Sequence, residues 1–406
     1  MPALVAIALV PALLLWAVWN WADGQAQAAV DAPVEPSIPP GAPGPVLPTG
    51  LTSLRRTAPF LSRQLNFGAF QTALRPLLDQ VGDGSCAAVS IDGVLAGERN
   101  AATATIPAST LKVLTAAVAL DRLGAEFTYT TRLVGPAPAG STIDGDVYLV
   151  GGGDPLLSGG WYEDATLDAN PAFNTTVIDE LAVQLADLGV TEIRGTLRGD
   201  GSRYDDEWYV DSWGPGVAGT EAGPLGALLV NDARVRGDDF RGSDPNEAGA
   251  REFVRILGEH GIAVSGGSGT GVAPAGTPEL AAITSQPLPA ILEEMLTNSD
   301  NNTAELVVKE IGFQAAGQGT RSAGLDTMAT SIAGWGVDVA GLVLADGSGL
   351  SLDNRVSCTT MLGVLQHAGA DSPVGQGLAV AGQTGTMKSV LVDTPLAGRL
   401  LGKTGT

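Results

Sequence analysis

Histidine is nearly absent from this chain: only His260 and His367 occur in its 406 residues. Each stands where a helix is expected to end, just before Gly261 and Ala368-Gly369, so neither is placed like the base of a Ser-His-Asp triad. Lysine is also scarce, with four residues. If the chain carries a serine nucleophile, one of these lysines is the natural proton acceptor.

Basic residues are also few compared with acidic ones. The chain has 22 basic against 44 acidic residues, a net charge of −22, and no basic cluster. This balance argues against nucleic acid and anionic lipid as partners, and favours a neutral or cationic polymer. Hydrophobic residues make up 44% of the chain, enough to bury the cores of two or three domains.

The N-terminal segment has no charged side chain from Met1 to Ala22, and Leu4 to Trp21 is long enough to cross a bilayer. Ala26-Gln27-Ala28 has the small-x-small form of a signal-peptidase site, so residues 1–28 are expected to direct export. The alternative is an uncleaved anchor that tethers the chain to a membrane. In both cases the remainder is expected to be extracytoplasmic.

Two further features fit an exported protein. Residues 29–50 are rich in proline and read as an extended linker. Cys86 and Cys358 are the only cysteines, an even pair that predicts either one disulfide or two buried free thiols.

The predicted secondary structure of the remaining chain changes from helical to β-rich and then back to helical. Ala108 to Leu123 is almost wholly apolar between Pro107 and Gly124 and predicts a buried helix. Short β-like runs then follow, interrupted by one expected helix around residues 177–188, and helical patterns return at 289–297 and 303–311. The predicted β-like runs are Tyr129 to Val134, Asp146 to Val150 and Glu192 to Arg198. We therefore expect one domain formed by 51–124 and 270–406, split by an inserted β-rich domain at 125–269.

Three short motifs carry the chemistry. Ser109 and Lys112 are three apart on the expected helix, so an amine lies within reach of a hydroxyl. Taken alone this is a helix cap with an unrelated lysine, but a lysine in an apolar helix is costly unless it is partnered. Ser299-Asp300-Asn301 alone is an ordinary helix N-cap. Lys403-Thr404-Gly405-Thr406 alone is a turn or an edge strand, and its near-copy Gln383 to Thr386 lacks the lysine.

Together, and in this order, Ser-x-x-Lys, Ser-Asp-Asn and Lys-Thr-Gly form the signature of penicillin-binding proteins and serine β-lactamases. The chain resembles the low-molecular-mass, class C penicillin-binding D-alanyl-D-alanine carboxypeptidase/endopeptidase family, which has a large insertion after the first motif. The resemblance runs from about residue 55 to the last residue. Other segments similar to that family are Gly145 to Pro155, Gly199-Asp200 with Trp213, Ser299 to Glu305, and Asp346 to Ser351 with Asn354-Arg355.

The resemblance implies an α/β (α+β) fold: a β-lactamase/DD-peptidase-like transpeptidase domain with an antiparallel sheet and helices, interrupted by the β-rich insertion. It also implies roles. Ser109 would be the nucleophile and Lys112 its base; Ser299 would relay a proton to the leaving amine, and Asn301 would hold Lys112 and the substrate amide.

The resemblance assigns substrate binding to the last four residues. Lys403 and Thr404 would bind the substrate's terminal carboxylate. Gly405 would allow the substrate backbone to approach, and the backbone N–H groups of Ser109 and Thr406 would form the oxyanion hole. The family's sheet continues past this motif, whereas the sequence stops at Thr406, so a C-terminally truncated chain is expected.

The predicted function is a serine-type D-Ala-D-Ala carboxypeptidase acting on peptidoglycan stem peptides through an acyl-enzyme, with β-lactam antibiotics as covalent inhibitors. Endopeptidase cleavage of cross-links stays open. The alternatives are a serine β-lactamase, which the long insertion disfavours, and a non-catalytic wall-associated binding protein. No cofactor, metal or nucleic acid is expected.

Two other clusters have simpler interpretations. Asp205, Asp206, Glu207 and Asp211 match no calcium-loop spacing and predict a solvated acidic loop. Tyr204, Trp208 and Trp213 predict a small aromatic core rather than a glycan contact.

Overall fold

The computed structural model describes residue 20 and residues 54–163, 165 and 170–406. The predicted export segment and proline-rich linker lie outside these residues, apart from Asn20. No helix in the described part of the chain combines the length and apolarity needed to cross a membrane. The chain divides into two compact units, Met1–Asn66 and Phe67–Thr406.

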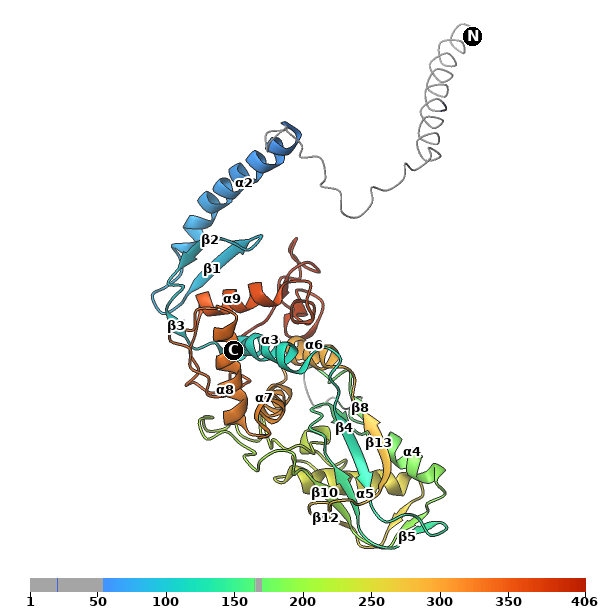
Figure 1. Ribbon diagram of the computed structural model, residues 1–406. Coiled ribbons are helices and arrows are strands. Elements are labelled where there is room, and N and C mark those ends of the chain that lie inside the picture. The colour runs from blue at the N-terminus through green and yellow to red at the C-terminus, as the bar shows by residue number, and fades with distance from the viewer. Residues whose placement is uncertain (1–19, 21–53, 164, 166–169) are drawn as a thin grey trace, which may run out of the picture. The chain divides into compact units, whose positions relative to one another are not determined.

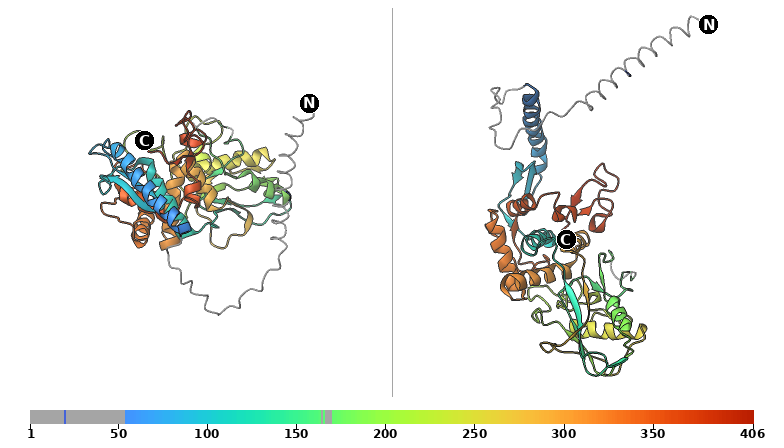
Figure 2. Two further views of the ribbon diagram at one scale, coloured as in Figure 1. Left: turned by 90° about the horizontal axis from the view of Figure 1, so that it is seen from above. Right: turned by 45° about the vertical axis from the view of Figure 1, so that its right-hand side comes forward.

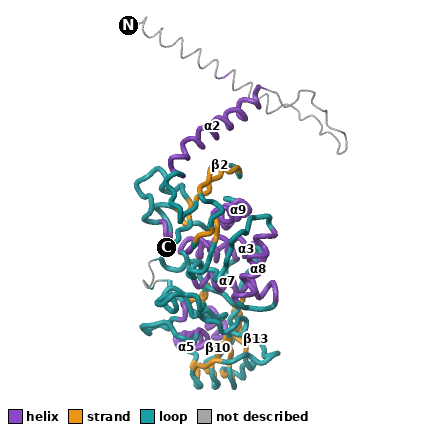
Figure 3. The backbone as a smooth tube through the Cα atoms, turned by 90° about the vertical axis from the view of Figure 1, so that its left-hand side faces the viewer, coloured by secondary structure: helices purple, strands orange, loops and turns teal. Residues whose placement is uncertain are grey.

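The helical part of the larger unit is built around α3 (Lys112–Leu123), which follows a short 3₁₀ turn at Ala108–Leu111. Every residue from Lys112 to Ala119 is buried. Figures 1 and 3 show α3 among the other helices of this part, and apolar side chains from α3, α6, α7, α8 and α9 form one core. The other helices here are α6 (Leu288–Asn298), α7 (Asn301–Ala316), α8 (Arg321–Gly334), α9 (Cys358–Ala368) and α10 (Pro373–Gln376), with a further 3₁₀ turn at Gly385–Met387. Helix α2 (Leu54–Leu78) begins in the smaller unit and ends in the larger one.

The strands of the helical part pair as antiparallel two-stranded ladders. They are β1 (Ala87–Ile91) with β2 (Val94–Arg99), β3 (Ala104–Thr105) with β14 (Val356–Ser357), and β15 (Ala379–Val380) with β16 (Leu401–Gly402). The last pair corrects one expectation: the strand ends at Gly402, so Lys403 and the residues after it are not part of an edge strand.

The inserted part contains a five-stranded sheet of order β12-β10-β6-β4-β13, parallel over its first three strands and antiparallel over the rest. Alternating burial, as in β6, fits strands with one face on a core. The strands are β4 (Thr130–Val134), β6 (Val147–Val150), β10 (Leu197–Asp200), β12 (Ser268–Thr270) and β13 (Glu279–Thr284). Since β13 pairs with β4, the sheet extends past the expected end of the insertion at residue 269, which falls inside β12.

Two helices, α4 (Asp179–Asp187) and α5 (Pro245–Glu259), pack on this sheet beside each other (Figure 2). Short strands complete the insertion: β5 (Thr142–Ile143), β9 (Glu192–Ile193) and β11 (Ala263–Val264) in one parallel sheet, β7 (Leu157–Ser158) with β8 (Thr176–Val177) in another, and a 3₁₀ turn at Asn231–Ala233. The β-like run predicted from Glu192 to Arg198 contains two short strands with a break between them. It divides between β9 and β10, which belong to different sheets.

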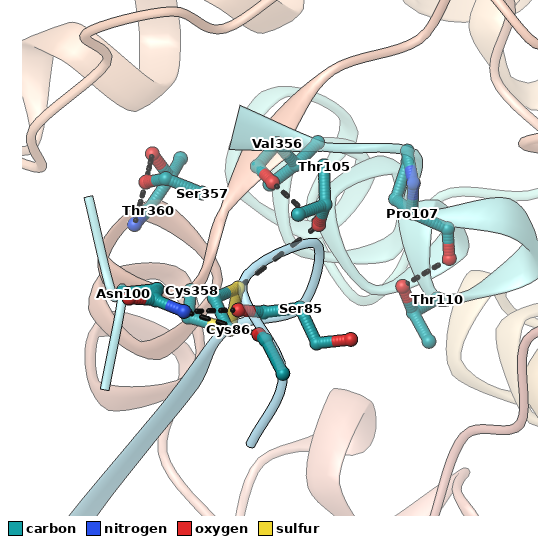
Figure 4. The surroundings of a disulfide bond; sticks show 11 residues. Ser85, Cys86, Asn100, Thr105, Pro107, Thr110, Val356, Ser357, Cys358 and Thr360 are labelled. Atoms are coloured by element: carbon teal, nitrogen blue, oxygen red, sulfur yellow. Dashed lines mark hydrogen bonds between the residues drawn. A yellow bond between two sulfur atoms is a disulfide. The ribbon is translucent and has the colours of Figure 1, made fainter. Parts of the chain in front are cut away.

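Cys86 and Cys358 form a disulfide with their Cα atoms 5.9 Å apart (Figure 4). The bond joins the residue before β1 to the first residue of α9. Of the two alternatives for the cysteine pair, the disulfide is confirmed and the two free thiols are excluded. Figure 4 also shows the Asn100 side-chain amide donating to the Ser85 carbonyl oxygen at 2.9 Å, which closes the loop beside the disulfide.

Candidate active site

Ser109 and Lys112 lie where the chain enters α3. Ser109 belongs to the 3₁₀ turn and Lys112 is the first residue of the α-helix, so the two side chains share a face. The Lys112 Nζ donates to Ser109 Oγ at 3.1 Å. The residue before the serine, Ala108, has a φ of 46°, a left-handed conformation that an alanine adopts only under constraint.

Lys112 is completely buried, and its ammonium has three acceptors. Besides Ser109 Oγ, these are Asn301 Oδ1 at 2.7 Å and the Ser348 carbonyl oxygen at 2.7 Å. All three N–H bonds of the ammonium are thus satisfied. Burial lowers the pKa of Lys112 to about 8, although negative charge on Asp300, Glu305 and Asp346 partly opposes this shift. A fraction of the amine is therefore neutral near pH 7 to 8 and can accept a proton.

The Ser299-Asp300-Asn301 segment joins α6 to α7. Ser299 ends α6 with a φ of 67°, and the Asp300 side chain caps α7 by accepting from the Thr303 N–H at 2.5 Å. The cap interpretation is therefore right for Asp300. The turn that the cap fixes directs Asn301 to Lys112 and Ser299 to Lys403.

Lys403 follows β16 and donates to Ser299 Oγ at 2.7 Å and to the Thr404 carbonyl oxygen at 3.0 Å. Burial and the positive charge of Lys112 lower the pKa of Lys403 to about 7. Thr404 Oγ1 lies 3.0 Å from Thr386 Oγ1, within the near-copy of the motif. Gly405 passes close to the turn of Ser109, because a Cβ there would stand 3.0 Å from the Pro107 carbonyl oxygen, and Thr406 is exposed.

A buried turn at residues 346–351 supplies the third acceptor of Lys112. Glu305, on α7, accepts from the backbone N–H groups of Gly347 and Ser348, at 3.0 and 2.7 Å. Burial and the neighbouring Asp346 raise the pKa of Glu305 to about 7. Asp346 in turn accepts from the N–H groups of Gly349 and Ser351. These bonds fix the Ser348 carbonyl toward Lys112.

Sequence reasoning placed Trp213 in a small aromatic core and gave Glu305 no individual role, but both bond to this turn. Trp213 Nε1 donates to Asp346 Oδ2 at 3.0 Å, so the aromatic residue expected in a small core also contacts the site. A usable signal was present for Glu305: an acidic residue in an apolar helix is costly unless its carboxylate accepts hydrogen bonds.

The acidic loop at 205–211 is not simply solvated. Asp205 forms an ion pair with Lys309 at 2.6 Å, and Glu207 pairs with Arg321. The histidines lie at helix ends as predicted: His260 caps α5, and His367 lies near the end of α9, stacked on Trp335.

A polar pocket of about 280 Å³ opens beside Ser299 and Asn301. Its other wall comes from the inserted part, including Thr220, Glu221 and Asp232. The insertion thus borders the candidate active site.

Comparison with known proteins finds a matching family, relatives similar in sequence, and solved structures with a similar fold. The model of the D-Ala-D-Ala carboxypeptidase 3 (S13) family matches residues 76–233 and 225–406. Carboxypeptidase Rv3627c of Mycobacterium tuberculosis is 30% identical over 401 residues, covering 94% of this chain and 82% of that protein. The D-alanyl-D-alanine carboxypeptidase of Actinomadura sp. R39 is 31% identical over 432 residues, covering 84% and 77%. Among solved structures, penicillin binding protein 4 (dacB) from Haemophilus influenzae shares the fold, with a TM-score of 0.67 at 21% identity over 82% of this chain and 87% of that one.

Proposed function

The chain belongs to the D-Ala-D-Ala carboxypeptidase 3 (S13) family, and from this premise we propose that Ser109 is its nucleophile and Lys112 the base that activates it. The observation that carries the proposal is the buried Lys112 amine, bonded at once to Ser109 Oγ and Asn301 Oδ1. Two motifs 189 residues apart in sequence meet at this amine.

The reaction begins when neutral Lys112 takes the proton of Ser109 Oγ as the oxygen attacks the carbonyl carbon between the two D-alanines. The C–N bond breaks and the leaving D-alanine amine takes up a proton by way of Ser299. The product is an ester between Ser109 and the shortened peptide, which water then hydrolyses. These steps need no cofactor and no metal.

Substrate recognition uses the second lysine. No ion pair among the described residues involves Lys112 or Lys403. A terminal carboxylate bound by Lys403 and Thr404 would provide the missing negative charge and raise the pKa of Lys403. Gly405 gives the substrate backbone room, and the N–H groups of Ser109 and Thr406 would stabilise the oxyanion.

The substrates that fit this site are peptidoglycan stem peptides ending in D-Ala-D-Ala, met outside the cytoplasm. Residues 4–21 would be the export device or the membrane tether. A β-lactam would acylate Ser109 in the same way, but its leaving amine stays attached to the acyl group and hinders the attack of water. β-Lactams are therefore expected to be covalent inhibitors.

Replacing the nucleophile tests the proposal. Ser109→Ala should abolish covalent labelling by a fluorescent penicillin, whereas Ser265→Ala, at an exposed serine of the insertion, should be labelled like the unmodified chain. Labelling of Ser109→Ala would remove Ser109 from its role. Release of D-alanine from a stem-peptide mimic, without rapid hydrolysis of a chromogenic cephalosporin, distinguishes the peptidase from a β-lactamase.

A further inference from the structure

Two of the three groups that hold Lys112 are themselves held by the inserted part of the chain. Asn301 Oδ1 and the Ser348 carbonyl oxygen each accept a hydrogen bond from the Lys112 amine at 2.7 Å. Neither group is fixed by its own helix or turn alone. Asn301 bonds directly to the segment 205–223, and the turn that carries Ser348 bonds to the same segment through Asp346. This segment follows the inserted strand β10 in sequence and contacts the helices of the site.

The first connection fixes the Asn301 carboxamide. Asn301 Nδ2 donates to the Glu221 carbonyl oxygen at 3.0 Å, which directs the amide oxygen to Lys112. The adjacent Asn302 strengthens the contact by accepting from the Gly223 N–H at 2.7 Å. If the carboxamide rotated by 180°, its NH₂ group would face the Lys112 amine and its oxygen would face the Glu221 oxygen, so the inserted segment selects one orientation.

The second connection fixes the Ser348 carbonyl. Trp213 is 7% exposed, and its indole N–H donates to Asp346, which is fully buried. Asp346 organises the turn by accepting from the N–H groups of Gly349 and Ser351 at 2.8 and 2.6 Å. This turn carries the Ser348 carbonyl toward Lys112.

The segment itself is anchored to the helices of the site. The Lys309 amine on α7, which is 1% exposed, pairs with Asp205 and also donates to the Glu207 carbonyl oxygen at 2.8 Å. The Glu207 carboxylate pairs with Arg321 on α8. The segment therefore cannot shift without breaking these partly buried ion pairs and leaving the buried Lys309 amine unpaired, which is costly.

We propose that residues 205–223 are a positioning element of the reaction, holding Asn301 and the Ser348 carbonyl so that the Lys112 amine stays directed at Ser109 Oγ. The proposal rests on the proposed function of Ser109 and Lys112. It gives the insertion a role in the acyl-transfer step itself, through Trp213 as a positioning residue that acts on Lys112 by way of Asp346 and the turn of Ser348.

Trp213→Phe tests this role because it keeps the aromatic ring and removes only the indole N–H donor. The measurement is the rate of acylation by a fluorescent penicillin at a series of drug concentrations. Each rate is divided by the number of sites that the drug can titrate. The rate constant at saturation should fall roughly tenfold, as misplacement of a reacting group predicts. The concentration for half-saturation should not change, because the drug's own contacts remain.

The matched control is Trp161→Phe. Trp161 Nε1 also donates to a buried carboxylate of the insertion, Glu252 Oε1 at 2.6 Å, but this bond does not lead to Lys112. The control should show the unmodified rate constant per titrated site, even if it loses similar stability.

Glu207→Gln, which weakens the anchor at Arg321, is the second variant and should also lower the rate constant at saturation.

Each outcome decides the proposal. A fall in the rate constant for Trp213→Phe and Glu207→Gln, with Trp161→Phe unchanged, supports it. A loss of titratable sites with an unchanged rate constant per remaining site would mean a purely structural role and would overturn it. If the unmodified chain is not acylated at all, the proposed function fails instead, so the two failures are distinguishable.

Discussion

Burial lowers the proton affinity of both lysines of the site, and the charge of Lys112 lowers that of Lys403 further. Burial lowers the pKa of Lys112 to about 8 against the opposing charge of nearby carboxylates, and burial together with the charge of Lys112 lowers the pKa of Lys403 to about 7. The proposed roles need opposite protonation states, a neutral Lys112 as base and a cationic Lys403 for the substrate carboxylate. The site therefore has a limited pH range in which both hold.

This conflict predicts a particular pH dependence. At saturating penicillin, the acylation rate constant should rise as pH increases through about 8, because Lys112 loses its proton there. The concentration for half-saturation should rise above about pH 7, because free Lys403 loses the charge that attracts the drug's carboxylate. Stopped-flow labelling between pH 6 and 9 measures both quantities.

The matched control for the pH profile is Lys388→Gln, which changes an exposed lysine and should leave both curves in place. A rate constant at saturation that falls steadily between pH 7 and 9 would show that the proton acceptor is not Lys112.

Residue spacing could predict the meeting of Ser109 with Lys112, because a helix places positions three apart on one face. The Ser-Asp-Asn and Lys-Thr-Gly motifs could be found only as part of a set. The Ser348 carbonyl could not be predicted at all, since every residue has a carbonyl and its direction depends on a turn. The same holds for Trp213, whose partner Asp346 lies 133 residues away in sequence.

At the scale of elements, the turn at 346–351 packs directly on the turn that presents Ser109. Gly349 has a φ of +90°, and a Cβ at this position would stand 1.9 Å from the Ala108 carbonyl oxygen and 3.1 Å from the Ser109 nitrogen. Only a glycine allows the two backbones to approach this closely. The contact explains how the left-handed conformation of Ala108 is maintained.

Gly349→Ala should therefore lose penicillin labelling and destabilise the fold by more than about 2 kcal/mol, since the two turns must separate. Gly336→Ala is the matched control: Gly336 also has a positive φ, +76°, but nothing lies within 4 Å of its added Cβ. The control should cost only about 1 kcal/mol of backbone strain and keep labelling. Equal stability losses measured by urea unfolding, with labelling kept in both variants, would contradict the close-packing explanation.

Element prediction succeeded for the long apolar helix and for two of the three short β-like runs, which form β4 and β6. The buried helix expected at 108–123 is present as a 3₁₀ turn followed by α3, because its apolar side chains face the core on all sides. The run from Glu192 to Arg198 contains the strand-forming residues Ile193 and Thr196, but Gly195 interrupts it: a Cβ there would stand 2.2 Å from the backbone of Gly145. This backbone approach divides the run between two sheets, and no periodicity in the sequence reveals it.

At the scale of the whole chain, the insertion returns to the helices from which it departs. Its sheet begins with β4 shortly after α3 and ends with β13 shortly before α6, and the segment after β10 crosses back to α7 and α8. Arg203 forms two hydrogen bonds with the buried Glu310 of α7, at 2.9 and 2.7 Å, and stacks over Phe313. The sequence could indicate an insertion from the change in predicted secondary structure. It could not show that charged residues of the insertion contact α7 and α8.

Because buried contacts link the two parts, they should unfold together, and Lys309→Met tests this coupling. The substitution leaves Asp205 without its ion pair and two backbone carbonyl oxygens, those of Asp205 and Glu207, without their donor. The expected cost is about 3 kcal/mol, in one calorimetric transition at lower temperature.

Arg194→Met is the control: it removes two exposed ion pairs of the insertion, to Asp144 and Glu192, and should cost less than about 1 kcal/mol. The contrary result would be two calorimetric transitions for Lys309→Met, the higher at the melting temperature of the unmodified chain. The insertion and the helical part would then be separate folding units that the contacts of the acidic loop do not couple.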